Sequence, residues 1–236
     1  EPRYFFYNVE IVLHCRVGSV KLEATVAARV NLTREHIVET ASRLVDADPG
    51  TDLTMRRLAT ELGVDPMAIY HYVPGKNALM HAIVGRFLGD FQLPEDEGGW
   101  QAQLAALCHA FRELAHLHPG AFLIFVTNEK WADNELSIHE AFFGVLRIAG
   151  FDDRKTVNAS RQLLAYVESF AWGELTDWHR PYSAQERQEL DQVLADGRYP
   201  VTKSLADVMT STNADTEFRF GLNILLAGLE TELGRT

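Results

Sequence analysis

Residues 54–79 read TMRRLATELGVDPMAIYHYVPGKNAL and contain the most informative local signals in the chain. Thr54 is a favourable N-cap residue, and the apolar positions Leu58, Ala59 and Leu62 that follow it have helical spacing. Gly63 supplies the left-handed residue on which many helices end. The stretch therefore begins with a short, capped helix that stops at a glycine turn.

A second helix starts directly after that turn. Asp65 caps it, and Pro66 stands at its first position, where the missing backbone N–H costs nothing. Pro74 and Gly75 end it. Two short helices that cross around a tight turn form a helix-turn-helix, in which the second helix enters the major groove of DNA.

Helical patterns flank this pair on both sides. Thr33 can cap a preceding helix that runs to Asp48, and a longer helix is expected at about residues 77–91. The breaker-rich stretch 94–99 then marks a boundary. We expect three domains: an N-terminal extension at 1–32, a DNA-binding domain at 33–92, and a larger domain at 93–236.

The quoted stretch, together with the flanking helices, resembles the DNA-binding domain of TetR-type (tetracycline-repressor-like) transcriptional regulators. The C-terminal part matches that family only in plan, as a variable helical domain for ligand binding and dimerisation. The resemblance implies a pseudo-palindromic operator DNA, a small-molecule effector and repression that the effector relieves. It also assigns DNA contacts by position, to Thr54, Arg56, Pro66, Met67, Ala68, Tyr70, His71, Tyr72 and Lys76.

These positions also have plainer interpretations. Tyr70, His71 and Tyr72 are aromatic residues at a helix end, where packing and surface roles are common. At least one of Arg56 and Arg57 belongs to a solvated face, because adjacent helical residues point about 100° apart. Met67, Ala68 and His71 read bases less well than Arg, Asn or Gln, so DNA shape is expected to contribute to recognition.

Beyond residue 100 the patterns remain helical. Helices are expected at about 100–118, 121–127, 134–148, 155–178 and 213–233, and Ser183-x-x-Glu186 is a capping box for another. The fold class is therefore all-α, with a three-helix helix-turn-helix domain followed by a larger helical domain. In residues 1–32, alternation such as Val9, Ile11, Leu13 and Val20, Leu22, Ala24 instead indicates strands of unknown role.

Composition limits the class of protein. The chain has 236 residues, 47% of them hydrophobic, and no apolar run long enough for a membrane span. Its two cysteines fit a reducing compartment, and we expect a cytoplasmic protein. The net charge of −11 does not exclude DNA, because phosphate contacts need only a local positive surface.

The C-terminal half is rich in aromatic residues, which fill a core or line a mostly apolar ligand cavity. No Cys or carboxylate completes a metal site around His109, His116 and His118, and the magnesium–drug chelate of tetracycline repressors is not carried over. No metal and no cofactor are expected. The candidate effector contacts are Phe87, Phe91, Gln92, His109, Phe125, Asn128, Trp131, His139, Phe143, Tyr166 and Phe170.

The helices at 155–178 and 213–233 are expected to form a homodimer interface, the alternative being that both are buried within one chain. An effector beside Phe87, Phe91 and Gln92 would then swing the DNA-binding domains apart. The alternative function is a small-molecule-binding helical protein without specific DNA binding. No nucleophile elbow, phosphate-binding glycine loop or metal motif supports an enzyme.

Overall fold

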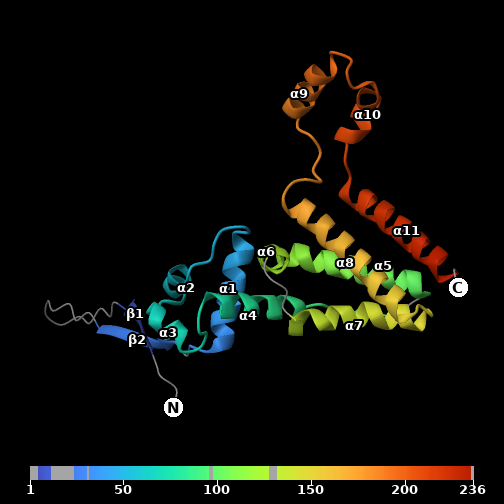
Figure 1. Cartoon of the computed structure of the whole chain (residues 1–236). Coiled ribbons are helices and arrows are strands. Elements are labelled where there is room, and N and C mark those ends of the chain that lie inside the picture. Colours follow the sequence, from blue (N-terminus) through green and yellow to red (C-terminus); the bar gives the residue numbers. More distant parts are fainter. Residues whose placement is uncertain (1–4, 12–23, 31, 96–97, 128–131, 235–236) are drawn as a thin grey trace. The chain divides into compact units, whose positions relative to one another are not determined.

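The structure of the protein is a computed structural model that describes residues 5–11, 24–30, 32–95, 98–127 and 132–234 (Figure 1). In these residues two strands precede eleven helices. From Leu32 onward the described residues form helices and the turns between them, which confirms the all-α fold. The described residues fall into two compact units: those up to residue 89 together with 118–127 and 132–134, and those within 90–117 together with 135–234.

The two strands lie in the N-terminal extension. Strand β1 (Phe5–Ile11) pairs antiparallel with β2 (Ala24–Val30), in a register that sets Phe5 opposite Val30 and Ile11 opposite Ala24. The alternating pattern therefore predicted strand correctly at Val9, Ile11, Ala24 and Val26. The rest of that pattern, between the strands, lies outside the described residues.

The first unit contains five helices, and the first three begin at the start signals read from the sequence, which are Thr33, Thr54 and Asp65. The Thr33 hydroxyl accepts a hydrogen bond from the backbone N–H of His36 at 3.1 Å and so caps the first helix. The first helix packs against the second, the fourth and the sixth. The helices are α1 (Arg34–Ala47), α2 (Met55–Leu62), α3 (Pro66–Tyr70), α4 (Lys76–Gly89) and α6 (Pro119–Thr127).

Helix α6 belongs to this unit although it follows the proposed boundary in sequence. It packs on α1 and α4, and the Phe122 ring lies edge-on to Phe87 with centroids 6.2 Å apart. Phe87, Phe122 and Ile37 are fully buried or nearly so. The division into compact units thus groups α6 with the helix-turn-helix rather than with the larger helical part.

The second unit is organised around one long helix. Helix α8 (Asp153–Leu175) packs against α5 (Trp100–Leu117) and α11 (Ala214–Leu233), and α7 (Ala132–Ile148) precedes it in the chain. Phe111, Phe142, Leu163 and Phe218 are buried between these helices. None of the helices in the described part of the chain has the length and apolar character needed to cross a membrane.

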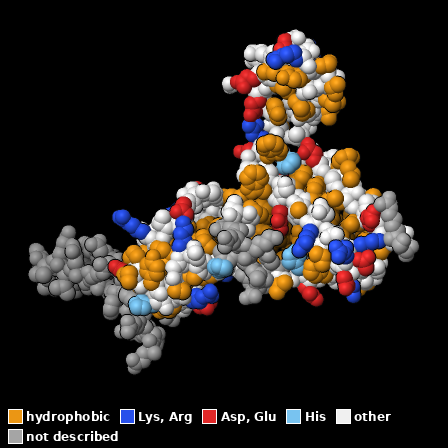
Figure 2. All heavy atoms as spheres, in the orientation of Figure 1, with side chains coloured by type: hydrophobic (Ala, Val, Ile, Leu, Met, Phe, Trp, Pro, Cys, Tyr) orange, Lys and Arg blue, Asp and Glu red, His pale blue; other side chains and the backbone are white. Residues whose placement is uncertain are grey.

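A helical hairpin separates α8 from α11 in sequence. Helix α9 (Ala184–Leu194) has the predicted capping box, in which Ser183 and Glu186 exchange hydrogen bonds of 3.3 and 2.8 Å. Helix α10 (Pro200–Thr210) was not predicted, because its N-cap residue, Tyr199, makes no side-chain capping bond. Hydrophobic side chains remain exposed on this hairpin (Figure 2), namely Val193, Val201, Leu205, Val208 and Met209.

Helix α8 ends at Leu175, earlier than the predicted 178. Asp177 adopts a left-handed conformation (φ 61°), and the N–H of Trp178 donates to the carbonyl of Gly173 at 2.7 Å. This helix-ending turn reverses the chain. It brings Trp178 and His179 back against the side of α8.

Candidate DNA-binding and effector sites

The turn between α2 and α3 has the geometry that the sequence predicted. The Thr54 hydroxyl accepts from the N–H of Arg57 at 3.1 Å and caps α2. Gly63 is left-handed (φ 62°, ψ 35°), and the N–H of Val64 donates to the carbonyl of Ala59 at 3.0 Å. These bonds satisfy the last carbonyls of α2 and fix the direction in which the chain leaves it.

Helix α3 is short, and it is held by its cap and its buried side. Asp65 accepts a hydrogen bond from the N–H of Met67 at 2.8 Å. Pro66, the residue after Asp65, stands at the first position of the helix and fixes its first turn. Ile69 and Leu58 are fully buried where α3 packs on α2, and Ala59 allows the close approach. A recognition helix anchored in this way presents its outer face rigidly.

That outer face carries most of the predicted DNA contacts. Met67 is 66% exposed and Tyr70 43% exposed; His71 is exposed, while Pro66 and Tyr72 are half-buried. The prediction for Ala68 needs correction, because its side chain is only 2% exposed and packs into the interior instead of lying on the outer face. In the first turn of α3, Met67 and Pro66 are therefore the predicted contact residues whose side chains remain accessible.

Two cations around the motif, Lys76 and Arg57, are paired with nearby carboxylates. Lys76, the first residue of α4, contacts Asp52. Arg57 lies 3.5 Å from Asp48, and both side chains are well exposed. Exposed pairs of this kind contribute little to stability and can exchange their carboxylate for a phosphate. Thr54 and Arg56 are exposed on the same motif.

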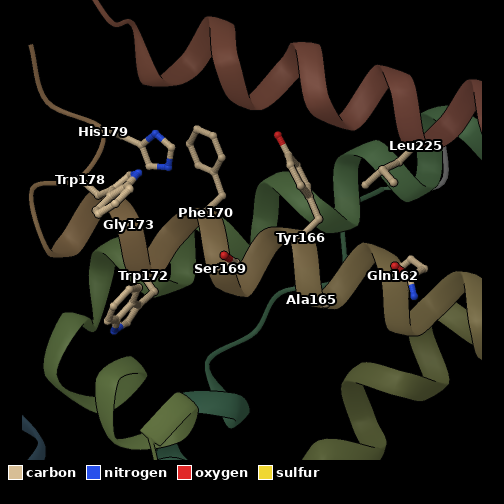
Figure 3. A pocket seen from close by; sticks show the side chains of 10 residues that line it. All are labelled: Gln162, Ala165, Tyr166, Ser169, Phe170, Trp172, Gly173, Trp178, His179 and Leu225. Carbon is tan, nitrogen blue, oxygen red and sulfur yellow. The ribbon is translucent and has the colours of Figure 1, made fainter. Parts of the chain in front are cut away.

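The second unit contains a pocket of about 700 Å³ along α8 (Figure 3). The rings of Phe170 and His179 stack at one end, with centroids 4.1 Å apart and planes 14° apart. Tyr166 stands beside them and donates its hydroxyl hydrogen to the carbonyl of Phe218 at 2.8 Å. The pocket is lined by Gln162, Ala165, Tyr166, Ser169, Phe170, Trp172, Gly173, Trp178, His179 and Leu225.

A buried ion-pair network lies on α5 and α8 beside this pocket. Arg112 binds both carboxylate oxygens of Glu174, at 2.7 and 2.5 Å, and the two side chains are 11% and 9% exposed. His116 lies 2.9 Å from the same carboxylate, and Asp215 lies 2.8 Å from Arg112. Arg112 also sits 4.7 Å above the centre of the Phe218 ring.

Burial and the ion-pair network shift the pKa of several groups in this region. Burial alone would raise the pKa of Glu174, but hydrogen bonds from Arg112 and His116 outweigh it, so the pKa is below its usual value. Burial, and after it the charge of Arg112, lower the pKa of His109 below its usual value. Burial raises the pKa of Tyr166 to about 12, so its hydroxyl remains protonated.

The remaining predicted effector residues lie elsewhere in their units. In the first unit the buried Phe87 ring lies 5.8 Å from the half-buried Phe125 ring, measured between centroids. In the second unit, the Phe91 and Phe111 ring centroids lie 6.2 Å apart. The Gln92 side chain bonds to the carbonyl of Asp90. The His109 ring contacts Phe218 edge-on, and the His139 ring stacks on Phe143. Nδ1 of His139 is buried and has no hydrogen-bond partner among the described residues. Asn128 and Trp131 lie outside the described residues. Of the predicted set, this pocket contains Tyr166 and Phe170.

Sequence reasoning missed the other eight lining residues. Four of them are spaced by three, four and three residues, so the sequence could have predicted that they share one face of α8: Gln162, Ala165, Ser169 and Trp172. The place of Trp178 and His179 could not have been predicted in this way, because only the turn at Asp177 brings them to the helix. In the part of the chain that the structure describes, no three His, Cys, Asp or Glu side chains are placed to hold a metal ion.

Comparison with known proteins agrees with this arrangement. The family described as "Bacterial regulatory proteins, tetR family" matches residues 37–83, and "Tetracyclin repressor-like, C-terminal domain" matches residues 93–233. The HTH-type transcriptional repressor DrrR1 of Streptomyces coeruleorubidus is 31% identical over 84% of this chain and 77% of its own length. The class D tetracycline repressor of Escherichia coli is 25% identical over 86% of this chain and 91% of its own.

Solved structures agree as well. Apo ActR from Streptomyces coelicolor is 27% identical with a TM-score of 0.75, over 88% of this chain and 99% of that one. ActR in complex with actinorhodin gives the same TM-score of 0.75 and identity of 27%, over 87% of this chain and 100% of that one. With the capped helix-turn-helix and the separate helical unit, these matches decide the family. The chain belongs to the tetR family of bacterial regulatory proteins, and it is a ligand-responsive, DNA-binding transcriptional regulator.

Proposed function

We propose that this regulator is a repressor that binds operator DNA as a homodimer through the outer face of α3, and that a small molecule in the α8 pocket releases it. The observation that carries the DNA contact is the exposure of Met67, Tyr70 and His71 on a capped, glycine-turned helix pair. Arg56 and Lys76 flank that face and would bind phosphates. Such a repressor acts in the cytoplasm, where the DNA is.

Dimerisation is supported by two exposed stripes that a single chain leaves uncovered. On α8 the stripe is Gln162, Ala165, Ser169 and Trp172; on α11, Phe220 and Ile224 are 69% and 57% exposed. Small residues there allow close helix approach. Ala165, Ala227 and Gly228 are exposed, whereas Ala171 and Gly173 are already buried within the chain. A twofold dimer would place two recognition helices about 34–36 Å apart, one turn of DNA.

The same stripe of α8 forms one wall of the pocket, so a second copy would close its open side. The effector that suits this pocket is a flat polycyclic aromatic molecule with oxygen substituents. Phe170, His179 and Trp178 offer ring faces, while Gln162 and Ser169 offer hydrogen bonds. ActR, which is similar over most of the chain, has been solved with actinorhodin and with (S)-DNPA.

The effector must bind the form that releases DNA more tightly than the form that holds it, since otherwise it shifts nothing. A coupling of about 1–3 kcal/mol would lower DNA affinity several-fold to about a hundredfold. The sequence predicts that α4, near Phe87, Phe91 and Gln92, transmits the effect of effector binding to the DNA-binding domain. Of these, Phe87 lies in α4, and the others follow its end at Gly89.

A direct test selects duplexes from random-sequence DNA with the full chain and measures their affinity by fluorescence anisotropy. Actinorhodin is then titrated into the complex. We expect it to release the DNA, and Phe170→Ala to bind the same DNA but respond at least tenfold more weakly to actinorhodin. Selection of no duplex would favour a ligand-binding protein without DNA binding. Tight actinorhodin binding that leaves DNA affinity unchanged would contradict the effector proposal.

A further inference from the structure

Helix α6 occupies an unusual place in the chain. It lies between α5 and α7 in sequence, and α5 belongs to the second unit. Nevertheless α6 packs with α1 and α4 in the DNA-binding unit. Only His118 separates the end of α5 at Leu117 from the start of α6 at Pro119. At this point a single residue therefore links a helix of the second unit to a helix of the DNA-binding unit.

One carboxylate holds the start of α6 against α1. Asp46, near the C-terminal end of α1, accepts hydrogen bonds through one oxygen from the backbone N–H groups of Gly120 and Ala121, both at 3.0 Å. Its other oxygen lies 3.0 Å from Nδ1 of His118. The Asp46 side chain is 18% exposed. A negative charge at a helix N-terminus also interacts favourably with the helix dipole, so Asp46 caps α6 from a different helix.

The two backbones meet at this point without side chains between them. A Cβ atom added to Gly120 would lie 2.0 Å from the carbonyl oxygen of Val45 in α1, a distance that no side chain permits. The contact therefore cannot be adjusted by a change of rotamer. If α6 moves, either α1 moves with it or the hydrogen bonds to Asp46 break.

On the other side, α5 is bound to the pocket helix. Arg112 and His116, in the second half of α5, form hydrogen bonds with Glu174 of α8. Trp172 and Gly173, which directly precede Glu174 in α8, line the pocket. We infer that Asp46 is the positioning residue that couples the pocket to the DNA-binding unit, by making α6 and α1 move as one. This inference rests on the proposed function.

Coupling is reciprocal, so DNA itself can serve as the probe and no effector is needed. The full chain is studied by hydrogen–deuterium exchange with and without the duplex that the wild type selects from random DNA. In the wild type, DNA should change exchange at least threefold in residues 112–117. In Asp46→Ala this change should disappear, while DNA affinity stays within about threefold.

Glu39→Gln is the matched control, because Glu39 is exposed on the same helix and has the same charge. It should keep the full DNA-linked change. Asp46→Asn retains one oxygen that can accept from α6, and it should keep part of the change. If circular dichroism shows that Asp46→Ala does not fold, Asp46→Asn becomes the deciding variant. A DNA-linked change in exchange as large as that of the wild type in Asp46→Asn would then overturn the inference.

Two results separate this inference from the function on which it rests. If the wild type binds its duplex but residues 112–117 do not respond, or if folded Asp46→Ala responds like the wild type, the coupling role is refuted and DNA binding stands. If the wild type selects no duplex, DNA binding is refuted, and the coupling role is refuted with it.

Discussion

Glu174→Ala tests whether the ion-pair network beside the pocket stabilises the second unit. Removing this carboxylate leaves Arg112, which is 11% exposed, without its bidentate partner. Asp215 at 2.8 Å and the ring of Phe218 at 4.7 Å remain as weaker substitutes, because Asp215 is 74% exposed. The variant therefore contains a mostly buried, poorly compensated guanidinium.

Breaking a buried pair by removing one partner costs about 3–5 kcal/mol, and the remaining contacts of Arg112 place this case near the lower end. For a chain of this size, about 3 kcal/mol corresponds to a Tm lower by roughly 6–12 °C. The measurement is thermal and urea unfolding followed by circular dichroism. Protein concentration is kept equal, because dimerisation makes Tm concentration-dependent.

Asp207→Ala is the control. It removes an ion pair of the same 2.5 Å length, with Arg187, but Asp207 is 91% exposed, so the loss of stability should be much smaller than in Glu174→Ala. Equal destabilisation in the two variants would refute the reasoning that burial makes the Arg112–Glu174 pair important.

The effect should also depend on pH in a defined direction. Because the pKa of Glu174 is lowered in the folded state, its carboxylate stabilises the fold at pH values above the unfolded pKa of about 4.3. That contribution is lost as the pH falls through the folded pKa. The difference between wild type and Glu174→Ala should be complete at pH 7 and shrink below about pH 4.

Three further predictions concern DNA. Lys76→Ala and Tyr70→Phe should each weaken operator binding with little change in Tm. Lys76→Ala should also reduce the slope of the logarithm of the binding constant against the logarithm of the salt concentration by about one. Loss of the fold in either variant would instead show that the position is structural. Asp52→Asn should raise DNA affinity about two- to fivefold, because Lys76 then has no carboxylate to exchange for phosphate, and unchanged affinity would mean that Lys76 makes no phosphate contact. Deletion of residues 1–30 should leave DNA binding intact by anisotropy, whereas its loss would identify the β1–β2 segment as a DNA-binding arm.

The helix-turn-helix was predictable because each step in it depends on neighbouring residues. Thr54 and Asp65 cap the helices that follow them, and Gly63 adopts its left-handed conformation where the sequence requires a turn. Caps, turns and helical periodicity act within a few residues. The sequence alone therefore determined the two short helices, their order and the exposed aromatic end of the second one.

The effector pocket and the place of α6 required tertiary structure, because the contacts that create them join distant residues. Asp46 binds N–H groups more than seventy residues away, and Arg112 reaches Glu174 across sixty-two positions. Likewise, the turn at Asp177 brings His179 onto Phe170. No local pattern encodes such partners, since backbone amides look alike in sequence and a buried charge finds its partner only when helices pack.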